Sequence, residues 1–231
     1  MLERNKYSMR NITNEKVTEY IEQRYIPIDQ KLWRMRLDAE DKYIPIIQRD
    51  VETLMISILN ILKPKNILEV GTAIGYSSVV MAKTVDDSKI ITMERAPEMI
   101  EKAVETLKDF QVEDRVKILV GDARENMDLL REKCLKGEQE KFDFVFIDGA
   151  KSHYLEFWHK LKDQVKPGAI IFCDNVLMRG MTVDNSYDIR DKHRTNIKNM
   201  REFLDYITGL KDVQTSILPV GDGVTISYIK E

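Results

Sequence analysis

From residue 66 onward, short apolar runs alternate with amphipathic stretches, and this pattern restricts the fold more than any other feature of the chain. The apolar runs have the length of buried strands and lie at residues 67–70, 89–93, 116–120, 142–147 and 169–173. The stretches between them have helical spacing and lie at residues 76–84, 97–110, 123–134 and 154–165. Strands that alternate with helices predict right-handed crossovers and a parallel, doubly wound α/β sheet.

The C-terminal part departs from this alternation. After a helical stretch at residues 192–208, two more strand-like runs lie at 213–219 and 224–229. The turn Gly221-Asp222-Gly223 between them is too short for a crossover helix, so these runs predict an antiparallel hairpin at the sheet edge. The expected fold is therefore a Rossmann-like sheet of seven strands that ends in a hairpin.

The N-terminal part has apolar positions at helical spacing, interrupted by Pro27, Pro45 and Pro64. We expect a helical extension over residues 1–63, followed by the α/β domain over residues 64–231. The long N-terminal helices also favour self-association, so the chain is expected to form a homodimer.

Composition excludes several classes of protein. The chain has 231 residues, of which 43% are hydrophobic and 32% charged, which suits a globular protein with a sizeable core. Its net charge of -3 argues against a generally polybasic protein. Two cysteines are too few for a disulfide framework, which favours a reducing, cytoplasmic location. No apolar segment is long enough for a signal sequence or a membrane span, so a membrane partner is not expected.

Two of the apolar runs end abruptly in oxygen-bearing side chains. Asp148 follows the run 142–147, and Asp174 and Asn175 follow the run 169–173. Because the carboxyl ends of parallel strands line the ligand crevice of such a sheet, these three side chains can converge. Carboxylate and amide oxygens suit Mg²⁺, or Mn²⁺ or Ca²⁺ in its place. The alternative is that these residues only form turns, a common use of Asp and Asn.

A glycine turn follows the first apolar run. Gly71 and Gly75 are four residues apart, which leaves the signature for binding a dinucleotide pyrophosphate incomplete. Glu94 ends the second run, where a carboxylate can accept both hydroxyls of an adenosine ribose. An adenosine without a pyrophosphate fits both observations, and S-adenosylmethionine is such a ligand. The alternative is that the glycines permit close packing and that Glu94 is a surface acid.

The residues around these sites resemble a known enzyme family. Residues 68–77, 147–151 and 174–177 resemble the cation-dependent O-methyltransferases that include the catechol and caffeoyl-CoA enzymes. The resemblance spans about residues 40–231. Three stretches, 72–77, 176–180 and 217–223, are more similar still to the bacterial tRNA 5-hydroxyuridine methyltransferases, which make 5-methoxyuridine at the wobble position.

The resemblance implies an S-adenosylmethionine-dependent methyltransferase domain over residues 64–231 and assigns roles to particular residues. The implied metal ligands are Asp148, Asp174 and Asn175. The implied cofactor contacts are Ile47, Glu69, Gly71, Ala73, Ser77, Glu94, Asp122, Ala123 and Asp148. Lys151 is the implied catalytic base, because the charge of a neighbouring Mg²⁺ disfavours a protonated amine. The alternative for Lys151 is an ordinary solvated lysine at a helix start.

The choice of substrate depends on weaker signals. Mg²⁺ chelated by two vicinal oxygens acidifies and orients a hydroxyl, and both catechols and 5-hydroxyuridine offer such a pair. The segment 179–201 has a small basic excess, from Arg179, Arg190, Lys192, Arg194, Lys198 and Arg201 against Asp184, Asp188 and Asp191. This segment is expected to contact phosphates of a tRNA anticodon loop, although a solvated helix face is an equal alternative on composition alone.

Three functions therefore compete. The expected one is Mg²⁺-dependent methyl transfer to the 5-hydroxyl of 5-hydroxyuridine in tRNA. The alternative is an O-methyltransferase that acts on small catechol-like or caffeoyl-CoA-like molecules. The third is a non-catalytic domain that binds an adenosine ligand.

Overall fold

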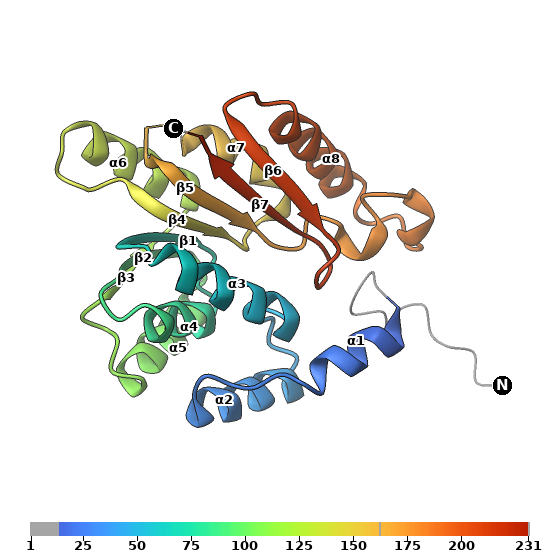
Figure 1. Cartoon of the computed structure of the whole chain (residues 1–231), viewed down its shortest axis with the longest axis horizontal. Helices are drawn as coiled ribbons and strands as arrows, with labels where there is room; N and C mark the ends of the chain where they lie inside the picture. The colour runs from blue at the N-terminus through green and yellow to red at the C-terminus, as the bar shows by residue number, and fades with distance from the viewer. Residues whose placement is uncertain (1–13, 162, 231) are drawn as a thin grey trace.

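The computed structural model describes residues 14–161 and 163–230, and its centre is one seven-stranded sheet (Figure 1). The strands are β1 (Asn66–Val70), β2 (Lys89–Glu94), β3 (Val116–Val120), β4 (Phe142–Ile147), β5 (Val165–Cys173), β6 (Val213–Leu218) and β7 (Val224–Ile229). Their order is β3-β2-β1-β4-β5-β7-β6, and the pairs β5·β7 and β6·β7 are antiparallel, whereas the other pairs are parallel. The predicted doubly wound sheet with a terminal hairpin is confirmed.

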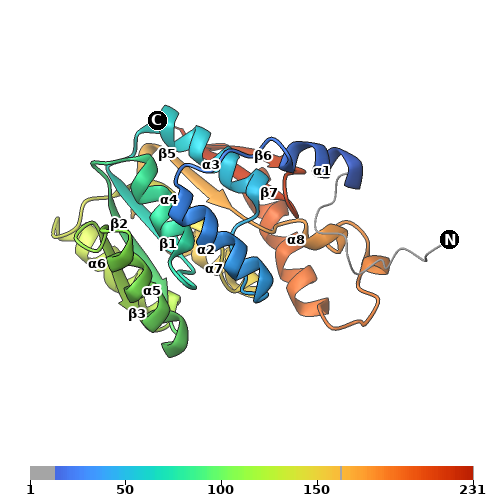
Figure 2. The same ribbon diagram turned by 90° about the horizontal axis from the view of Figure 1, so that it is seen from below.

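Helices cover both faces of the sheet (Figure 1). They are α1 (Glu15–Glu22), α2 (Gln30–Asp41), α3 (Arg49–Leu62), α4 (Tyr76–Thr84), α5 (Pro97–Asp109), α6 (Ala123–Leu135), α7 (Tyr154–Lys160) and α8 (Arg194–Thr208). Figure 2 looks onto the face covered by α2 to α5, and α6 to α8 cover the other face. Along β4, Phe144 and Phe146 are buried on the first face, and Val145 and Ile147 on the second. This two-sided burial explains why the run is apolar without interruption from Phe144 to Ile147.

The N-terminal helices share the core of the sheet. Leu32 of α2 and Met55 of α3 belong to the same buried cluster as Ile67 of β1 and Val79 of α4. The division at residue 63 stays a prediction, and residues 1–13 of the expected extension lie outside the described residues. Among the helices that the structure describes, none is both long enough and apolar enough to cross a membrane.

Three element boundaries differ from the prediction. The helix expected over 154–165 ends at Lys160, and β5 already begins at Val165 rather than at residue 169. The register between β4 and β5 shifts at Phe142 and Phe144, and this irregularity accommodates Pro167 and Gly168 inside the strand. Helix α8 begins at Arg194 rather than at residue 192.

The late start of α8 has a local cause. The Asp188 carboxylate accepts hydrogen bonds from the backbone N–H groups of Lys192, at 3.3 Å, and His193, at 2.9 Å. These bonds hold the segment before α8 in a turn of its own.

Candidate active site

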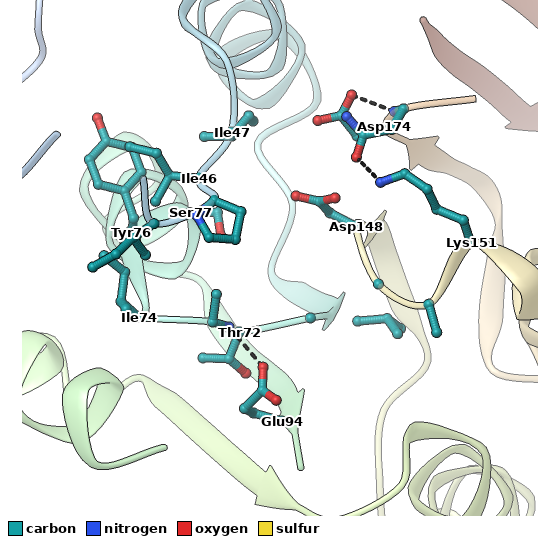
Figure 3. A pocket seen from close by; sticks show the side chains of 18 of the residues that line it. Ile46, Ile47, Thr72, Ile74, Tyr76, Ser77, Glu94, Asp148, Lys151 and Asp174 are labelled. Atoms are coloured by element: carbon teal, nitrogen blue, oxygen red, sulfur yellow. Dashed lines mark hydrogen bonds between the residues drawn. The ribbon is translucent and has the colours of Figure 1, made fainter. Parts of the chain in front are cut away.

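A cavity of about 690 Å³ opens at the carboxyl ends of β1, β2, β4 and β5 (Figure 3). It lies where the strand order reverses, between β1 and β4, which is the usual ligand position in an open α/β sheet. The predicted site residues that line it are Ile47, Gly71, Ala73, Ser77, Glu94, Asp122, Ala123, Asp148, Lys151, Asp174 and Asn175. The topology therefore brings together residues from six separate parts of the chain.

The glycine turn after β1 lies against the end of β4. A Cβ atom on Gly71 would come within 2.3 Å of the Asp148 carbonyl oxygen, and Gly71 has a φ of +106°. Asp148 N–H donates to the Val70 carbonyl at 3.0 Å, and the amides of Gly71 and Thr72 donate to Met93 of β2. Only glycine fits this close backbone approach. Gly75 then caps α4 with a φ of 81°.

Glu94 lies at the end of β2, with its carboxylate fixed by the backbone. One oxygen accepts from the Ala73 N–H at 3.0 Å, and the other accepts from the N–H groups of Arg95 and Ala96 at 2.8 and 2.9 Å. Figure 3 shows the Glu94 side chain directed at the turn that carries Thr72. The carboxylate is thus held in place before any ligand binds and keeps lone pairs for ribose hydroxyls.

Glu69 is the one predicted site residue that does not line the cavity. It is fully buried in β1, where the Ser77 and Ser78 hydroxyls both donate to its carboxylate. Burial raises the pKa of Glu69 to about 7, although the serine hydrogen bonds oppose this shift. Because Ser77 does line the cavity, Glu69 acts on the site through the orientation of that hydroxyl.

Asp122 caps α6 at another side of the cavity. Its carboxylate accepts from the Arg124 N–H at 2.9 Å and forms a two-pronged pair with the Arg124 guanidinium, at 2.9 and 2.8 Å. Arg124 holds the pKa of Asp122 well below its usual value. Arg124 itself lines the cavity and was not expected from the sequence, where nothing distinguishes it from other surface arginines.

The predicted metal ligands meet at the far side of the cavity. Asp148 and Asp174 follow β4 and β5, and Figure 3 shows Asp148, Asp174 and Lys151 around one space. Asn175 has a φ of 57°, a left-handed conformation that Asn tolerates better than most residues. Its amide oxygen accepts from Lys151 Nζ at 2.7 Å.

Asp222 joins this group from the hairpin turn and was missed as a site residue. Its carboxylate accepts a hydrogen bond from the side-chain amide of Asn175, and it lines the cavity. The sequence did place an aspartate between Gly221 and Gly223, but a turn is the ordinary explanation for that pattern.

The electrostatics of this group fit a divalent cation. Burial raises the pKa of Asp148, and burial together with Asp148 and Asp222 raises that of Asp174. Lys151 opposes both shifts. Across the part of the chain that the structure describes, no three His, Cys, Asp or Glu side chains are grouped as metal ligands, so the set would need the Asn175 amide oxygen. The buried Asp174, the half-buried Asp148 and the Asn175 amide offer hard oxygen donors of the kind that Mg²⁺ prefers.

Comparison with known proteins agrees with this site. A model of the O-methyltransferase family matches residues 39–230. The chain belongs to the O-methyltransferase family. It is 30% identical to a caffeoyl-CoA O-methyltransferase of Stellaria longipes over 174 residues, which cover 74% of this chain and 71% of that protein. It is 32% identical to O-methyltransferase imqG of Aspergillus flavus over 143 residues, which cover 62% of this chain and 57% of that protein.

A solved structure extends the comparison to almost the whole chain. The SAH-bound methyltransferase of Podospora anserina has a TM-score of 0.76 and 29% identity, and the match covers 95% of this chain and 97% of that one. The predicted class of enzyme, an S-adenosylmethionine-dependent O-methyltransferase, is confirmed. The alternative of a non-catalytic domain that binds an adenosine ligand has no support from these comparisons. The closer resemblance to the tRNA enzymes stays a prediction.

Three cations of the basic segment 179–201 have partners within this O-methyltransferase. Arg194 pairs with Asp191, Lys198 with Glu202 at 3.7 Å, and Arg201 donates to the Thr182 carbonyl at 2.7 Å and to Asn185 at 2.8 Å. The charges of Arg194 and Lys198 are therefore partly neutralised, and the Arg201 guanidinium is held by hydrogen bonds within the protein. Arg179 differs from these three because it lines the cavity.

We expect Glu94→Ala to weaken the binding of S-adenosylmethionine by about 1.5 to 3 kcal/mol, the scale of hydrogen bonds to a charged acceptor. Isothermal titration calorimetry with the purified protein measures this change. Glu98→Ala is the matched control, because Glu98 is an exposed acid in the first turn of α5. Unchanged affinity in Glu94→Ala would mean that the adenosine ribose does not bind at the end of β2.

Proposed function

We propose that this O-methyltransferase transfers a methyl group from S-adenosylmethionine to the 5-hydroxyl of 5-hydroxyuridine at the wobble position of tRNA, with Mg²⁺ as the metal. The observation that carries the proposal is the meeting of Asp148, Asp174, Asn175 and Lys151 at one side of a cavity whose other side holds Glu94 and Ser77. A methyl donor and a metal-chelating acceptor can then face one another, as in-line transfer requires.

Each residue of the site has a distinct role in this reaction. Glu94 accepts hydrogen bonds from the ribose hydroxyls, and Ser77, oriented by Glu69, binds the methionine end of the cofactor. S-adenosylmethionine supplies the methyl group. A Mg²⁺ ion held by Asp148, Asp174 and Asn175 would lower the pKa of the substrate hydroxyl and fix its direction. Lys151, which lies beside Asn175, takes the proton from that hydroxyl.

Support for tRNA as the substrate comes from the sequence resemblance and from one basic side chain. The stretches 176–180 and 217–223, which resemble the tRNA enzymes, meet in the structure, because Val176 N–H donates to the Gly223 carbonyl at 2.8 Å. Asp222 and Arg179 of these stretches both line the cavity. An arginine at the mouth of the site suits a phosphate next to an unstacked nucleotide.

The second candidate is a small-molecule O-methyltransferase. Its support is the similarity to caffeoyl-CoA O-methyltransferases, whose substrates carry the vicinal oxygens that a metal can chelate. The same site residues serve both reactions, so only the substrate distinguishes the two candidates. A homodimer and a cytoplasmic location also stay predictions.

A direct comparison of substrates tests the proposal. The purified enzyme should have a far higher kcat/KM for tRNA that contains 5-hydroxyuridine than for free catechols, measured at one salt concentration. Arg179→Asn should raise the KM for tRNA and reduce the salt slope of binding by about 1, as expected for one lost phosphate contact. Asn is chosen because Arg179 has a φ of 56°, which Asn tolerates.

The matched control is Arg194→Ala, because Arg194 pairs with Asp191 at the exposed start of α8. This variant should leave the KM for tRNA nearly unchanged. A preference for catechols, or normal 5-methoxyuridine in the tRNA of cells that lack the gene, would assign the chain to the small-molecule enzymes.

A further inference from the structure

A buried network of charged and phenolic side chains joins the N-terminal helices to α4. Arg36 of α2 is 1% exposed and pairs with Glu52 of α3, which is fully buried. Arg36 Nε donates to the Tyr76 hydroxyl at 3.1 Å, and that hydroxyl donates to Glu52 at 2.9 Å. The Tyr25 hydroxyl donates to the other oxygen of Glu52. Every member of the network is therefore satisfied by another.

The network reaches the wall of the cavity at two points. The Arg36 guanidinium donates to the Ile47 carbonyl at 2.8 Å, and its central carbon lies 4.7 Å from the centre of the Tyr76 ring. Tyr76 is the first residue of α4, and Ser77 follows it. Figure 3 shows Ile47, Tyr76 and Ser77 together on one side of the cavity, away from Lys151. Arg36 thus fixes a loop and a helix start that come from different parts of the chain.

Stability alone is a poor explanation for this arrangement. Buried ion pairs contribute little to stability compared with apolar side chains of similar volume, because the desolvation of both charges offsets their attraction. What an ionic network offers instead is fixed geometry, since the planar guanidinium has five donors at set angles. Burial, with help from Glu52, raises the pKa of Tyr25 to about 12, so its hydroxyl remains a donor.

We propose that Arg36 and Glu52 are positioning residues that hold the Ile47 segment and the first turn of α4 at the separation required by the methionine end of S-adenosylmethionine. The N-terminal helices are then a working part of the cofactor site. This inference rests on the proposed function, which places the methionine end at Ser77, and Ile47 lines the same cavity.

The experiment separates positioning from stability with a fully apolar replacement. The triple variant Arg36→Met, Glu52→Leu and Tyr76→Phe removes both charges and the hydroxyl between them, so no buried charge is left unpaired. We expect its Tm to stay within a few degrees of that of the unaltered protein. The Kd for S-adenosylhomocysteine, measured by calorimetry on the full chain, should rise by about tenfold to a hundredfold, as for misplaced binding groups. An unchanged Kd in the folded triple variant overturns the proposal.

Two further variants keep the test decisive. If the triple variant does not fold, Arg36→Lys replaces it, because lysine keeps the charge but cannot hold Tyr76, Glu52 and Ile47 together. A folded Arg36→Lys protein should also show a raised Kd, and a normal Kd there overturns the proposal equally. Lys83→Met is the matched control: it breaks the 3.0 Å pair between Lys83 of α4 and Asp29, which caps α2, outside the cavity. It should leave the Kd unchanged.

Ser77→Ala distinguishes failure of this inference from failure of the proposed function. If Ser77→Ala leaves the Kd for S-adenosylhomocysteine unchanged, the methionine end does not bind there, and the placement under the proposed function is wrong. If Ser77→Ala weakens binding but the triple variant does not, the placement holds and the positioning role of Arg36 and Glu52 is wrong.

Discussion

Chelation by EDTA should abolish methyl transfer by the purified protein and leave the binding of S-adenosylhomocysteine measurable. The reason is that the proposed ligands Asp148, Asp174 and Asn175 lie at the opposite side of the cavity from Glu94 and Ser77. Addition of Mg²⁺ or Mn²⁺ should restore the activity. Full activity in EDTA would exclude a metal mechanism.

A single substitution tests the same site without a chelator. In the unaltered protein the Asn175 N–H donates to the Asp174 carboxylate at 2.6 Å. Asp174→Asn keeps the shape of the side chain and an oxygen that can accept this hydrogen bond. It should lower kcat by at least about a hundredfold, the scale of a lost electrostatic contact to a reacting oxygen. Its Tm should be equal or higher, because the burial of Asp174 beside Asp148 and Asp222 disfavours its charge. Asp128→Asn, on the exposed side of α6, is the control.

The second large effect is expected at Lys151. Lys151→Met should lower kcat by about 10² to 10⁴-fold, the usual contribution of a general base, and leave the KM for S-adenosylmethionine nearly unchanged. The reason is that Lys151 Nζ lies 2.7 Å from the Asn175 amide oxygen and thus beside the proposed metal ligands, away from Glu94. Steady-state kinetics with saturating substrate measure the effect.

Lys151→Arg decides what the lysine does. Arginine keeps the positive charge but does not give up a proton in proteins. If Lys151 acts as a general base, Lys151→Arg should therefore be as inactive as Lys151→Met. If Lys151→Arg retains most of the activity, then Lys151 only balances the charge of Asp148 and Asp174.

The fold could be predicted because its signals are local. Each parallel strand is a short, mostly apolar run that ends in a polar turn, and the short turn at Gly221-Asp222-Gly223 excludes a crossover helix. The predicted end of α7 was wrong because β5 starts where Val165 pairs with Phe142, and no local sequence pattern reveals this pairing. The positions of Asp148, Asp174 and Asn175 at strand ends predicted that these side chains converge, and all three line one cavity.

The missing parts of the site depend on contacts between distant segments. Asp222 reaches Asn175 across 47 positions of the chain, and Arg36 reaches Tyr76 across 40. In the sequence, Arg36 lies on an amphipathic helix rich in charged residues, where a solvated side chain is the ordinary expectation. For the same reason, the ion pairs of Arg194 with Asp191 and of Lys198 with Glu202 could not be assigned from the sequence.

The contact between Gly71 and the Asp148 carbonyl affects how this enzyme can evolve. The turn that carries Gly71 and the strand end that carries Asp148, a proposed metal ligand, touch through backbone atoms, with no room for even one methyl group between them. The spacing between methyl donor and acceptor is therefore set by the main chain. Substitutions around the rim, such as at Arg124 or Arg179, can change which acceptor is admitted without disturbing that spacing. A scaffold of this kind can acquire new substrates while its reaction stays the same.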